Sequence, residues 1–226
     1  MELCLKSIKS NYKFADIQDK KCHLPKNHDG KCIEFPFVSH LKSVKKTVAD
    51  KIVRDSTNTT GAAWKSDDAG PNRILRWGML LEDDELVKYG INMVNLKPGV
   101  QAKLREKAAP YDDCIEVAIK LTWLVYCMED APFPPEDLKI FLEFFHGPID
   151  QGITVCEICK EKLSFELFNQ AQRGKAALET CHKNPRIHNA NNVGFGHREC
   201  NIAQGNKTLD EFYEWLQLIL KRAGRI

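Results

Sequence analysis

The sequence predicts an α+β protein with a mainly helical region over residues 1–150 and a smaller, turn-rich module over residues 151–226. Two observations predict this division. Apolar residues of the first region recur at helical spacing, whereas short segments broken by turn residues follow Gly152. The chain of 226 residues is 43% hydrophobic and 28% charged, a composition typical of a protein that buries a core.

Helices are predicted where apolar residues follow helical spacing most clearly. Their ranges are Ser39–Asp55, Glu82–Tyr89, Asp112–Met128, Glu136–Phe145 and Leu209–Lys221. Thr208 and Glu211 form a capping-box pattern at the start of the last helix. The stretch from Gly147 to Gly152 is the predicted boundary between the two regions.

The apolar segments of the chain bear on its cellular location. The most apolar stretch, Val117 to Met128, is interrupted by Lys120 and is too short to span a bilayer. The N-terminal residues lack the long apolar core of a signal peptide. These observations predict a cytoplasmic protein without a membrane partner.

Two short pairs of metal-binding residues lie in the second region. Nine cysteines are many for a chain without a secretion signal, so they are first interpreted as metal ligands. Cys156 and Cys159 form a C-x2-C pair, and His197 and Cys200 form an H-x2-C pair. Two such turns complete the tetrahedral shell of a structural zinc ion and leave no open position for a substrate. Buried small residues or reactive thiols are the alternative.

A second group of cysteines and histidines lies between residues 22 and 40. Cys22, His28 and Cys32 could hold another zinc ion with His23 or His40 as the fourth ligand. This spacing matches common zinc motifs less well than the C-terminal pairs do. A polar turn with free thiols is the alternative interpretation.

Charge is unevenly distributed along the chain, although its net value is only +2. The net charge is +5 over residues 1–55, −5 over residues 56–149 and +2 over residues 150–226. Basic ends around an acidic middle suit a protein that binds a polyanion, and they suit an ordinary solvated surface equally well.

The segment from about Thr154 to Lys221 resembles the HNH, or ββα-metal, nuclease family. The resemblance depends on a His-x-x-Pro element at His182, a central Asn192 and a Cys-Asn pair that ends at Asn201, all framed by the predicted zinc ligands. It implies a β-hairpin centred on residues 181–195, followed by a helix that begins at the second ligand pair. The expected module is therefore a zinc-stapled ββα-metal fold with a further helix at its C-terminal end.

The resemblance implies a role for each matching residue. His182 matches the general base that removes a proton from the attacking water, because the ordinary pKa of an imidazole lies near neutral pH. Asn201 matches a ligand of the catalytic ion, and its amide oxygen is a hard ligand suited to Mg²⁺. Asn192 matches the middle asparagine, which bridges the loop backbone and supports the strand that carries the base.

One position departs from the pattern of the family. Many relatives carry an aspartate directly before the catalytic histidine as a second metal ligand, and this chain has Cys181 there. A thiolate is a poor ligand for Mg²⁺. Glu179 or Asn184 could supply the second contact, or the ion is held by Asn201, phosphate and water alone.

Several basic and aromatic residues are candidate DNA contacts. Trp64, Lys65, Arg73 and Arg76 lie in or beside a polar loop over residues 56–72, and Arg186 and His188 lie in the predicted hairpin loop. A surface loop with a packed tryptophan and a solvated hairpin loop are the alternatives.

The resemblance implies Mg²⁺-dependent hydrolysis of double-stranded DNA, with zinc as the structural ion. The chain is similar to type II restriction endonucleases, a subclass in which a homodimer is expected because two strands are cut. A homing or junction-resolving nuclease is the alternative within the family. A non-catalytic zinc module that binds nucleic acid or a protein is the alternative from another class.

Overall fold

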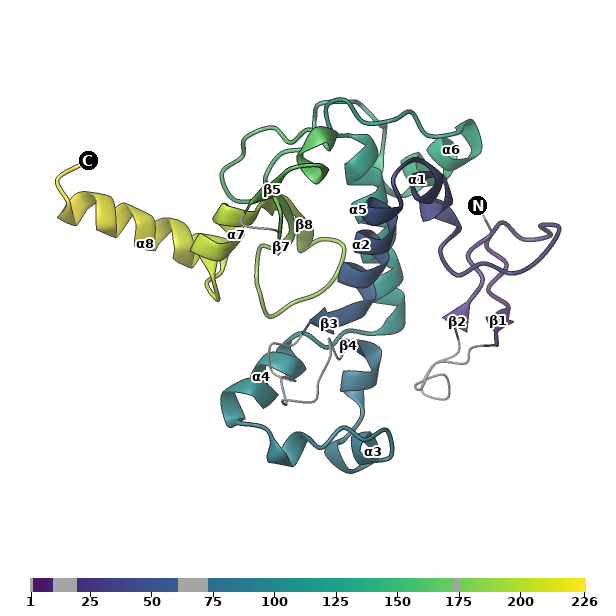
Figure 1. Cartoon of the computed structure of the whole chain (residues 1–226), viewed down its shortest axis with the longest axis horizontal. Helices are drawn as coiled ribbons and strands as arrows, with labels where there is room; N and C mark the ends of the chain where they lie inside the picture. The colour runs from purple at the N-terminus through teal and green to yellow at the C-terminus, as the bar shows by residue number, and fades with distance from the viewer. Residues whose placement is uncertain (1, 10–19, 61–72, 173–174) are drawn as a thin grey trace.

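The computed structural model is a mixed α+β structure, as the sequence predicts. The described residues are 2–9, 20–60, 73–172 and 175–226. Two helices, α2 (Lys46–Thr57) and α5 (Tyr111–Tyr126), pack side by side at the centre (Figure 1). Strand β8 (Val193–His197) packs against α5, and helix α8 (Leu209–Arg222) extends away from the body.

The prediction of one helix over residues 39–55 was wrong in one respect, because this segment forms two helices. Helix α1 (Ser39–Val44) and α2 are separated at Lys45, whose φ of −150° and ψ of 87° interrupt the helical backbone. Helix α1 folds against α2 instead of extending it. The apolar spacing did not reveal the break, because Leu41 and Ile52 reach the same core from both helices.

The ends of the other helices follow local chemistry. Helix α5 begins with two acidic residues in its first turn, which complement the positive end of the helix dipole. Helix α6 (Glu136–His146) starts after Pro135 and stops at Gly147, whose φ of +83° favours glycine. The predicted capping box of α8 is present, since Glu211 N–H donates to Thr208 Oγ1 at 3.3 Å and Thr208 N–H donates to Glu211 Oε2 at 2.8 Å.

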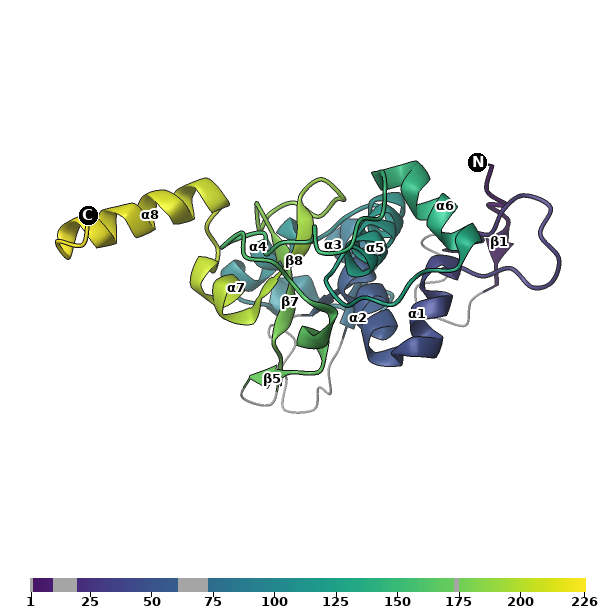
Figure 2. The same ribbon diagram turned by 90° about the horizontal axis from the view of Figure 1, so that it is seen from above.

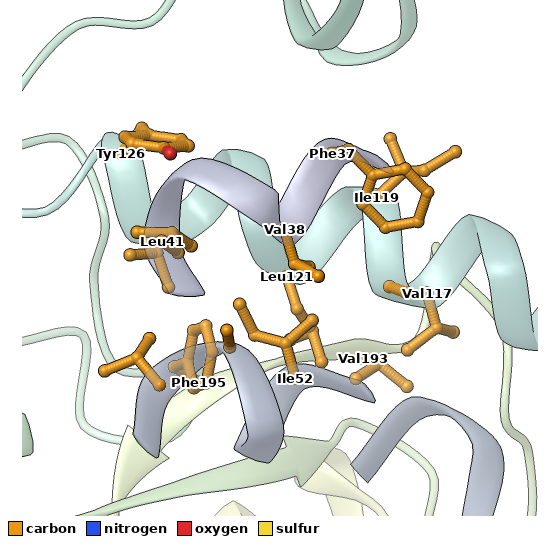
Figure 3. Close-up of a cluster of buried hydrophobic side chains, with 14 of the residues drawn as sticks. Phe37, Val38, Leu41, Ile52, Val117, Ile119, Leu121, Tyr126, Val193 and Phe195 are labelled. Carbon is orange, nitrogen blue, oxygen red and sulfur yellow. The ribbon is translucent and has the colours of Figure 1, made fainter. Parts of the chain in front are cut away.

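One hydrophobic cluster joins the helical region to the hairpin. Figure 3 shows Ile52 of α2, Leu121 of α5 and Phe195 of β8 within it, and each is at most 1% exposed. Burial of one such side chain contributes about 1.5–3 kcal/mol. The hairpin is therefore held in a fixed position relative to α2 and α5.

A second cluster forms a separate lobe below this core in Figure 1. Met79, Leu86 and Leu104 are at its centre and are at most 2% exposed. The lobe places helix α4 (Pro98–Glu106) opposite the module that follows residue 150.

The sheets are small and two-stranded. The remaining short elements are β1 (Ser7–Ile8), β2 (Lys20–Lys21), η1 (Pro36–Val38), β3 (Asn58–Thr60), β4 (Arg73–Leu75), η3 (Trp77–Leu80), α3 (Asp83–Val87), η4 (Met93–Asn95), η5 (Phe165–Phe168), β5 (Ala171–Gln172) and β6 (Lys175–Ala176). Pairing joins β1 to β2, β3 to β4 and β5 to β6, in each case antiparallel.

The hairpin and following helix that the sequence predicts are present at the expected place. Strand β7 (Leu178–His182) pairs antiparallel with β8, from Leu178 opposite His197 to His182 opposite Val193. Helix α7 (Arg198–Gln204) follows directly, with His197 as its N-cap.

Within the described residues, no helix has both the length and the apolar character needed to cross a membrane.

Candidate active site and metal sites

A cavity of about 610 Å³ lies between α4 and the β7–β8–α7 module. His182 of β7 and Asn201 of α7 both line it, as do Asp55 of α2 and Lys103 of α4. The fold therefore brings the predicted base and the predicted metal ligand, which are separated by the whole hairpin loop, to one cavity.

A relay of two imidazoles fixes the proton positions on His182. His182 Nε2 lies 3.0 Å from His188 Nδ1, and His188 Nε2 lies 2.8 Å from the carbonyl oxygen of Ser56. A carbonyl only accepts, so His188 Nε2 carries the proton and its Nδ1 accepts from His182 Nε2–H. The unprotonated nitrogen of His182 is then Nδ1, which no hydrogen bond among the described residues uses.

Both rings of the relay are held neutral. Burial lowers the pKa of His182 to about 3, and the charge of Arg76 adds to this effect. Burial also lowers the pKa of His188 to about 2, again with Arg76 as the next cause. The Nδ1 lone pair of His182 is therefore unprotonated at neutral pH, and the same burial lowers the basicity of that nitrogen.

The position of His188 differs from the predicted one. The side chain is only 4% exposed, so His188 is a buried residue and not a solvated loop residue. The loop after β7 folds back onto α2, where the carbonyl of Ser56 receives the ring. Sequence spacing gave no signal for this contact, because the two residues are 132 positions apart.

Asn192 occupies the bridging place that the resemblance implies. Its Nδ2 donates to the carbonyl oxygens of Asn184 at 2.8 Å and Ile187 at 2.5 Å, and its Oδ1 accepts from Asn184 N–H at 2.8 Å. Gln204, which the sequence did not indicate, donates to the His182 carbonyl at 2.9 Å. These bonds fix the backbone that carries the imidazole.

Asp55 is a cavity residue that sequence reasoning missed. Its carboxylate accepts from Lys51 Nζ at 2.7 Å, Arg54 Nε at 2.7 Å and Thr180 Oγ1 at 2.9 Å. Burial opposes its ionisation, but the charges of Lys51 and Arg54 outweigh burial and hold the pKa of Asp55 below its ordinary value. An ionised carboxylate therefore lies beside the candidate base.

The predicted second metal ligands are both engaged with other groups. Glu179 lines the cavity and forms an ion pair with Arg198. Asn184 Oδ1 accepts from the backbone N–H of Arg186 at 3.0 Å, and Asn184 does not line the cavity. Glu179 is thus the better placed of the two.

Cys181 is fully buried on the other side of strand β7. Thr180 and His182, on one face of the strand, line the cavity, whereas Cys181 on the other face does not; Glu179 lines the cavity although it shares the face of Cys181. A Cβ placed on Gly196 would lie 2.7 Å from Cys181 Sγ and 3.1 Å from Cys156 Sγ, which shows how close the two sulfurs are to this glycine. Burial raises the pKa of the Cys181 thiol, so it stays neutral.

The four predicted ligands of the C-terminal zinc site converge. The ligand atoms of Cys156, Cys159, His197 and Cys200 all lie within 4.8 Å of one another. Lys160, with a φ of 62°, closes the turn by donating its N–H to the Cys156 carbonyl at 3.1 Å. Three sulfurs and one imidazole nitrogen in a closed group fit the tetrahedral shell of zinc.

The N-terminal group also converges, but with a different fourth member. The ligand atoms of Cys4, Cys22, His28 and Cys32 lie within 4.8 Å of one another. The backbone brings Cys4 there, because its N–H donates to the Leu24 carbonyl at 2.9 Å. No short spacing links Cys4 to the other three residues, so the sequence did not reveal it.

The two histidines predicted as alternatives for this fourth place lie elsewhere. His23 Nδ1 is 2.7 Å from the Glu34 carbonyl oxygen, and its ring stacks on Tyr111. His40 Nδ1 is 2.9 Å from the Tyr126 hydroxyl. Both rings are therefore used in packing, and neither belongs to the cluster.

The residues predicted to contact DNA differ from one another in burial and in their bonding partners. Arg76 is 5% exposed, and its Nη1 donates to the Lys107 carbonyl at 2.5 Å, so it is a buried part of the cavity wall. Arg186 is exposed, lines the cavity and pairs with Glu106 at 3.8 Å. Trp64 and Lys65 lie outside the described residues, as does the side chain of Arg73.

The cavity is lined by an imidazole, an amide, carboxylates and basic side chains. Comparison with known proteins shows which class of protein carries it. A chain from a solved structure described as "Crystal structure of a type II restriction endonuclease" is 46% identical, with 100% of both chains covered and a TM-score of 0.85. A search of curated proteins finds no match. The class is therefore restriction endonuclease, a DNA-hydrolysing nuclease.

The particular family follows from a family model described as DraIII, which matches residues 34–200. This match covers the candidate base, both C-terminal ligand pairs and most of the helical region. The chain belongs to the DraIII family.

Proposed function

We propose that this protein is a Mg²⁺-dependent, sequence-specific type II restriction endonuclease in which β7, β8 and α7 act as an HNH-type ββα-metal module. The observation that carries the proposal is the shared cavity of His182 and Asn201. The resemblance in sequence assigns the two residues complementary roles, and the unused Nδ1 of His182 supports the first of them.

In the proposed reaction, His182 Nδ1 removes a proton from a water molecule that attacks the scissile phosphorus. His188 keeps the ring in the tautomer that leaves Nδ1 free, because it accepts the other ring proton. Asn192 and Gln204 hold the loop and strand so that the imidazole stays at the cavity wall.

The oxygen donors at the cavity fit a hard divalent ion. Asn201 offers an amide oxygen, and Glu179 offers a carboxylate on the same wall, whereas Cys181 is turned away. We assign Asn201 as the metal ligand, with Glu179 rather than Asn184 as the second. A bound Mg²⁺ supplies stabilisation of the charge that develops on the leaving 3′ oxygen.

The wall of the cavity is suited to double-stranded DNA. Burial, followed by repulsion from Lys103 and Arg76, lowers the pKa of Lys107 to about 8. A phosphate placed among these three cations would relieve their mutual repulsion. Arg186, at the exposed rim of the cavity, is the residue that we assign to contact the DNA backbone.

We assign zinc to both Cys/His clusters, as a structural ion. The C-terminal ion would join the Cys156–Cys159 turn to the end of β8 and the start of α7, and the N-terminal ion would join the paired segments around Cys4 and Cys22. None of the nine cysteines forms a disulfide, which suits the reducing cytoplasm that the sequence predicts.

The proposal is tested by plasmid cleavage with zinc-loaded protein, with and without added Mg²⁺. Wild type is expected to give defined fragments only with Mg²⁺. Asn201→Ala is expected to lose cleavage, and Asn191→Ala, an exposed asparagine outside the cavity, is the matched control. DNA binding without cutting by the wild type would instead favour a non-catalytic zinc module, and undefined fragments would contradict sequence specificity.

A further inference from the structure

Helix α4 forms the wall of the cavity that faces the candidate catalytic residues. Figures 1 and 2 show α4 and α7 on the same side of the central helices α2 and α5. A DNA phosphate bound at Asn201 of α7 therefore places neighbouring nucleotides along α4, so the role of this helix rests on the proposed function. The cavity-facing side of α4 consists of four residues at helical spacing: Gly99, Ala102, Lys103 and Glu106.

The opposite side of α4 fixes the helix to its lobe. Gln101 Nε2 donates to the Met93 carbonyl at 2.8 Å, and Arg105 Nη1 donates to the Leu81 carbonyl at 2.6 Å. Leu104, on the same side of the helix, is 2% exposed in the core of the lobe. A side chain on the cavity-facing side is therefore presented by a rigid element, as precise recognition requires.

Glu106 is the least engaged of the three carboxylates that line the cavity. Asp55 and Glu179 are paired with basic side chains and are 15% and 28% exposed, whereas Glu106 is 46% exposed. Its ion-pair partner is Arg186, whose Nε lies 3.8 Å away and whose side chain is 56% exposed. An exposed pair of this kind contributes little to stability, so DNA can separate it.

A carboxylate in this wall is unfavourable for a polyanion unless it finds a hydrogen-bond donor there. Arg76, Lys103 and Lys107 line the same cavity and attract phosphates, whereas Glu106 repels them. The phosphates and sugars of a DNA duplex offer only acceptors to the protein. The donors that face the grooves are the amino groups of the bases. Glu106 is therefore suited to a base edge and not to the backbone.

The surroundings of each amino group favour cytosine as the base. Adenine N6 lies beside the acceptor N7, which repels a carboxylate. Guanine N2 lies in the minor groove, which is too narrow to admit an α-helix. Cytosine N4 lies in the major groove, which admits an α-helix, and its neighbour on the ring edge is a C–H group that repels no carboxylate.

We propose that Glu106 determines part of the sequence specificity of this protein, by accepting a hydrogen bond from the amino group of a cytosine in the major groove. Helix α4 is then the element that enters the groove, and Gly99 and Ala102 let it approach closely because they carry no bulky side chain. Separation of the ion pair frees Arg186 for the backbone contact assigned to it above.

Selection of bound DNA from a random double-stranded pool tests this inference. The zinc-loaded full chain is used without Mg²⁺, and the bound DNA is sequenced. The wild-type motif is expected to contain a C·G pair whose preference falls roughly 5–150-fold in Glu106→Ala, with the other positions unchanged. Glu106→Gln is expected to gain preference for adenine at that position, because a glutamine pairs with adenine N6 and N7.

Two control variants separate base reading from other effects. Glu116→Ala removes an exposed acid of α5 that does not line the cavity, so the motif and the affinity should stay unchanged. Arg186→Ala removes the ion-pair partner of Glu106 and should weaken binding to all sequences alike without changing the motif. Glu106 variants that keep the wild-type motif at every position, or that weaken binding uniformly, would overturn the role of Glu106.

The outcome is separate from that of the cleavage assay, because selection records binding alone. A protein that loses one C·G preference in Glu106→Ala but never cuts DNA would leave the inference intact and contradict the proposed function. A protein that cuts DNA at defined sites, with a motif independent of position 106, would overturn the inference and leave the proposed function in place.

Discussion

Replacing His182 with alanine is expected to lower the single-turnover rate of DNA cleavage roughly 10²–10⁴-fold, the range that positioned acid–base groups contribute. The change removes the only imidazole that lines the cavity within the described residues, whereas the buried partner His188 does not line it. The affinity for DNA, measured without Mg²⁺, should change little, because the basic wall of the cavity is retained. A His182→Ala enzyme that cuts at the wild-type rate would exclude this residue as the base.

Two substitutions of His188 distinguish positioning from mere packing. His188→Gln keeps an acceptor for His182 Nε2–H and a donor for the Ser56 carbonyl, so most of the cleavage rate should remain. His188→Phe fills the same space without either bond, and the rate should fall well below that of the glutamine variant. Nitrogen-15 shifts of the His182 ring should show the Nε2–H tautomer in wild type and His188→Gln but a mixture in His188→Phe. Equal rates for the two variants would contradict the relay.

Loss of the C-terminal zinc ion is expected to unfold the β7–β8–α7 module. Apparent zinc-binding energies of about 10–16 kcal/mol match or exceed the whole stability of a typical domain, about 5–15 kcal/mol. Cys156→Ser should therefore lower the zinc content from two ions per chain to one, reduce the melting temperature sharply and abolish cleavage. Metal analysis and thermal unfolding monitored by circular dichroism measure these outcomes.

Two further variants serve as controls for the zinc prediction. Cys181→Ala removes a buried thiol that lies beside the cluster but is not one of its four members, so both zinc ions should remain. Cys4→Ser should remove only the N-terminal ion. Retention of two zinc ions by Cys156→Ser, or loss of one by Cys181→Ala, would contradict the assigned ligands.

The parts of the site that the sequence predicted are those encoded by short spacing. The C-x2-C and H-x2-C pairs each place their two ligands by local geometry, and the hydrogen bond from Glu157 N–H to the Phe195 carbonyl at 3.0 Å brings the first turn to β8. The hairpin and helix α7 were instead expected from the resemblance to the HNH family. The capping box of α8 is likewise local, and it was found where the pattern predicted it.

The parts that the sequence missed depend on contacts between distant segments. Asp55 reaches Thr180 across 125 positions, and Ser56 reaches His188 across 132, because α2 packs where the hairpin loop returns. Cys4 joins its cluster through backbone pairing with Leu24, which no ligand spacing encodes. Apolar periodicity similarly did not show the break at Lys45, since both helices face the same core.

The most direct test of the proposed active site is a crystal structure of the His182→Ala protein with cognate DNA and Mn²⁺, in which anomalous scattering locates the ion. We expect one Mn²⁺ bound to the Asn201 side-chain oxygen and to the scissile phosphate, within the cavity between α4 and α7. Position 182 should lie on the opposite side of that phosphate. A scissile phosphate outside this cavity, or an ion that does not contact Asn201, would contradict the proposed site.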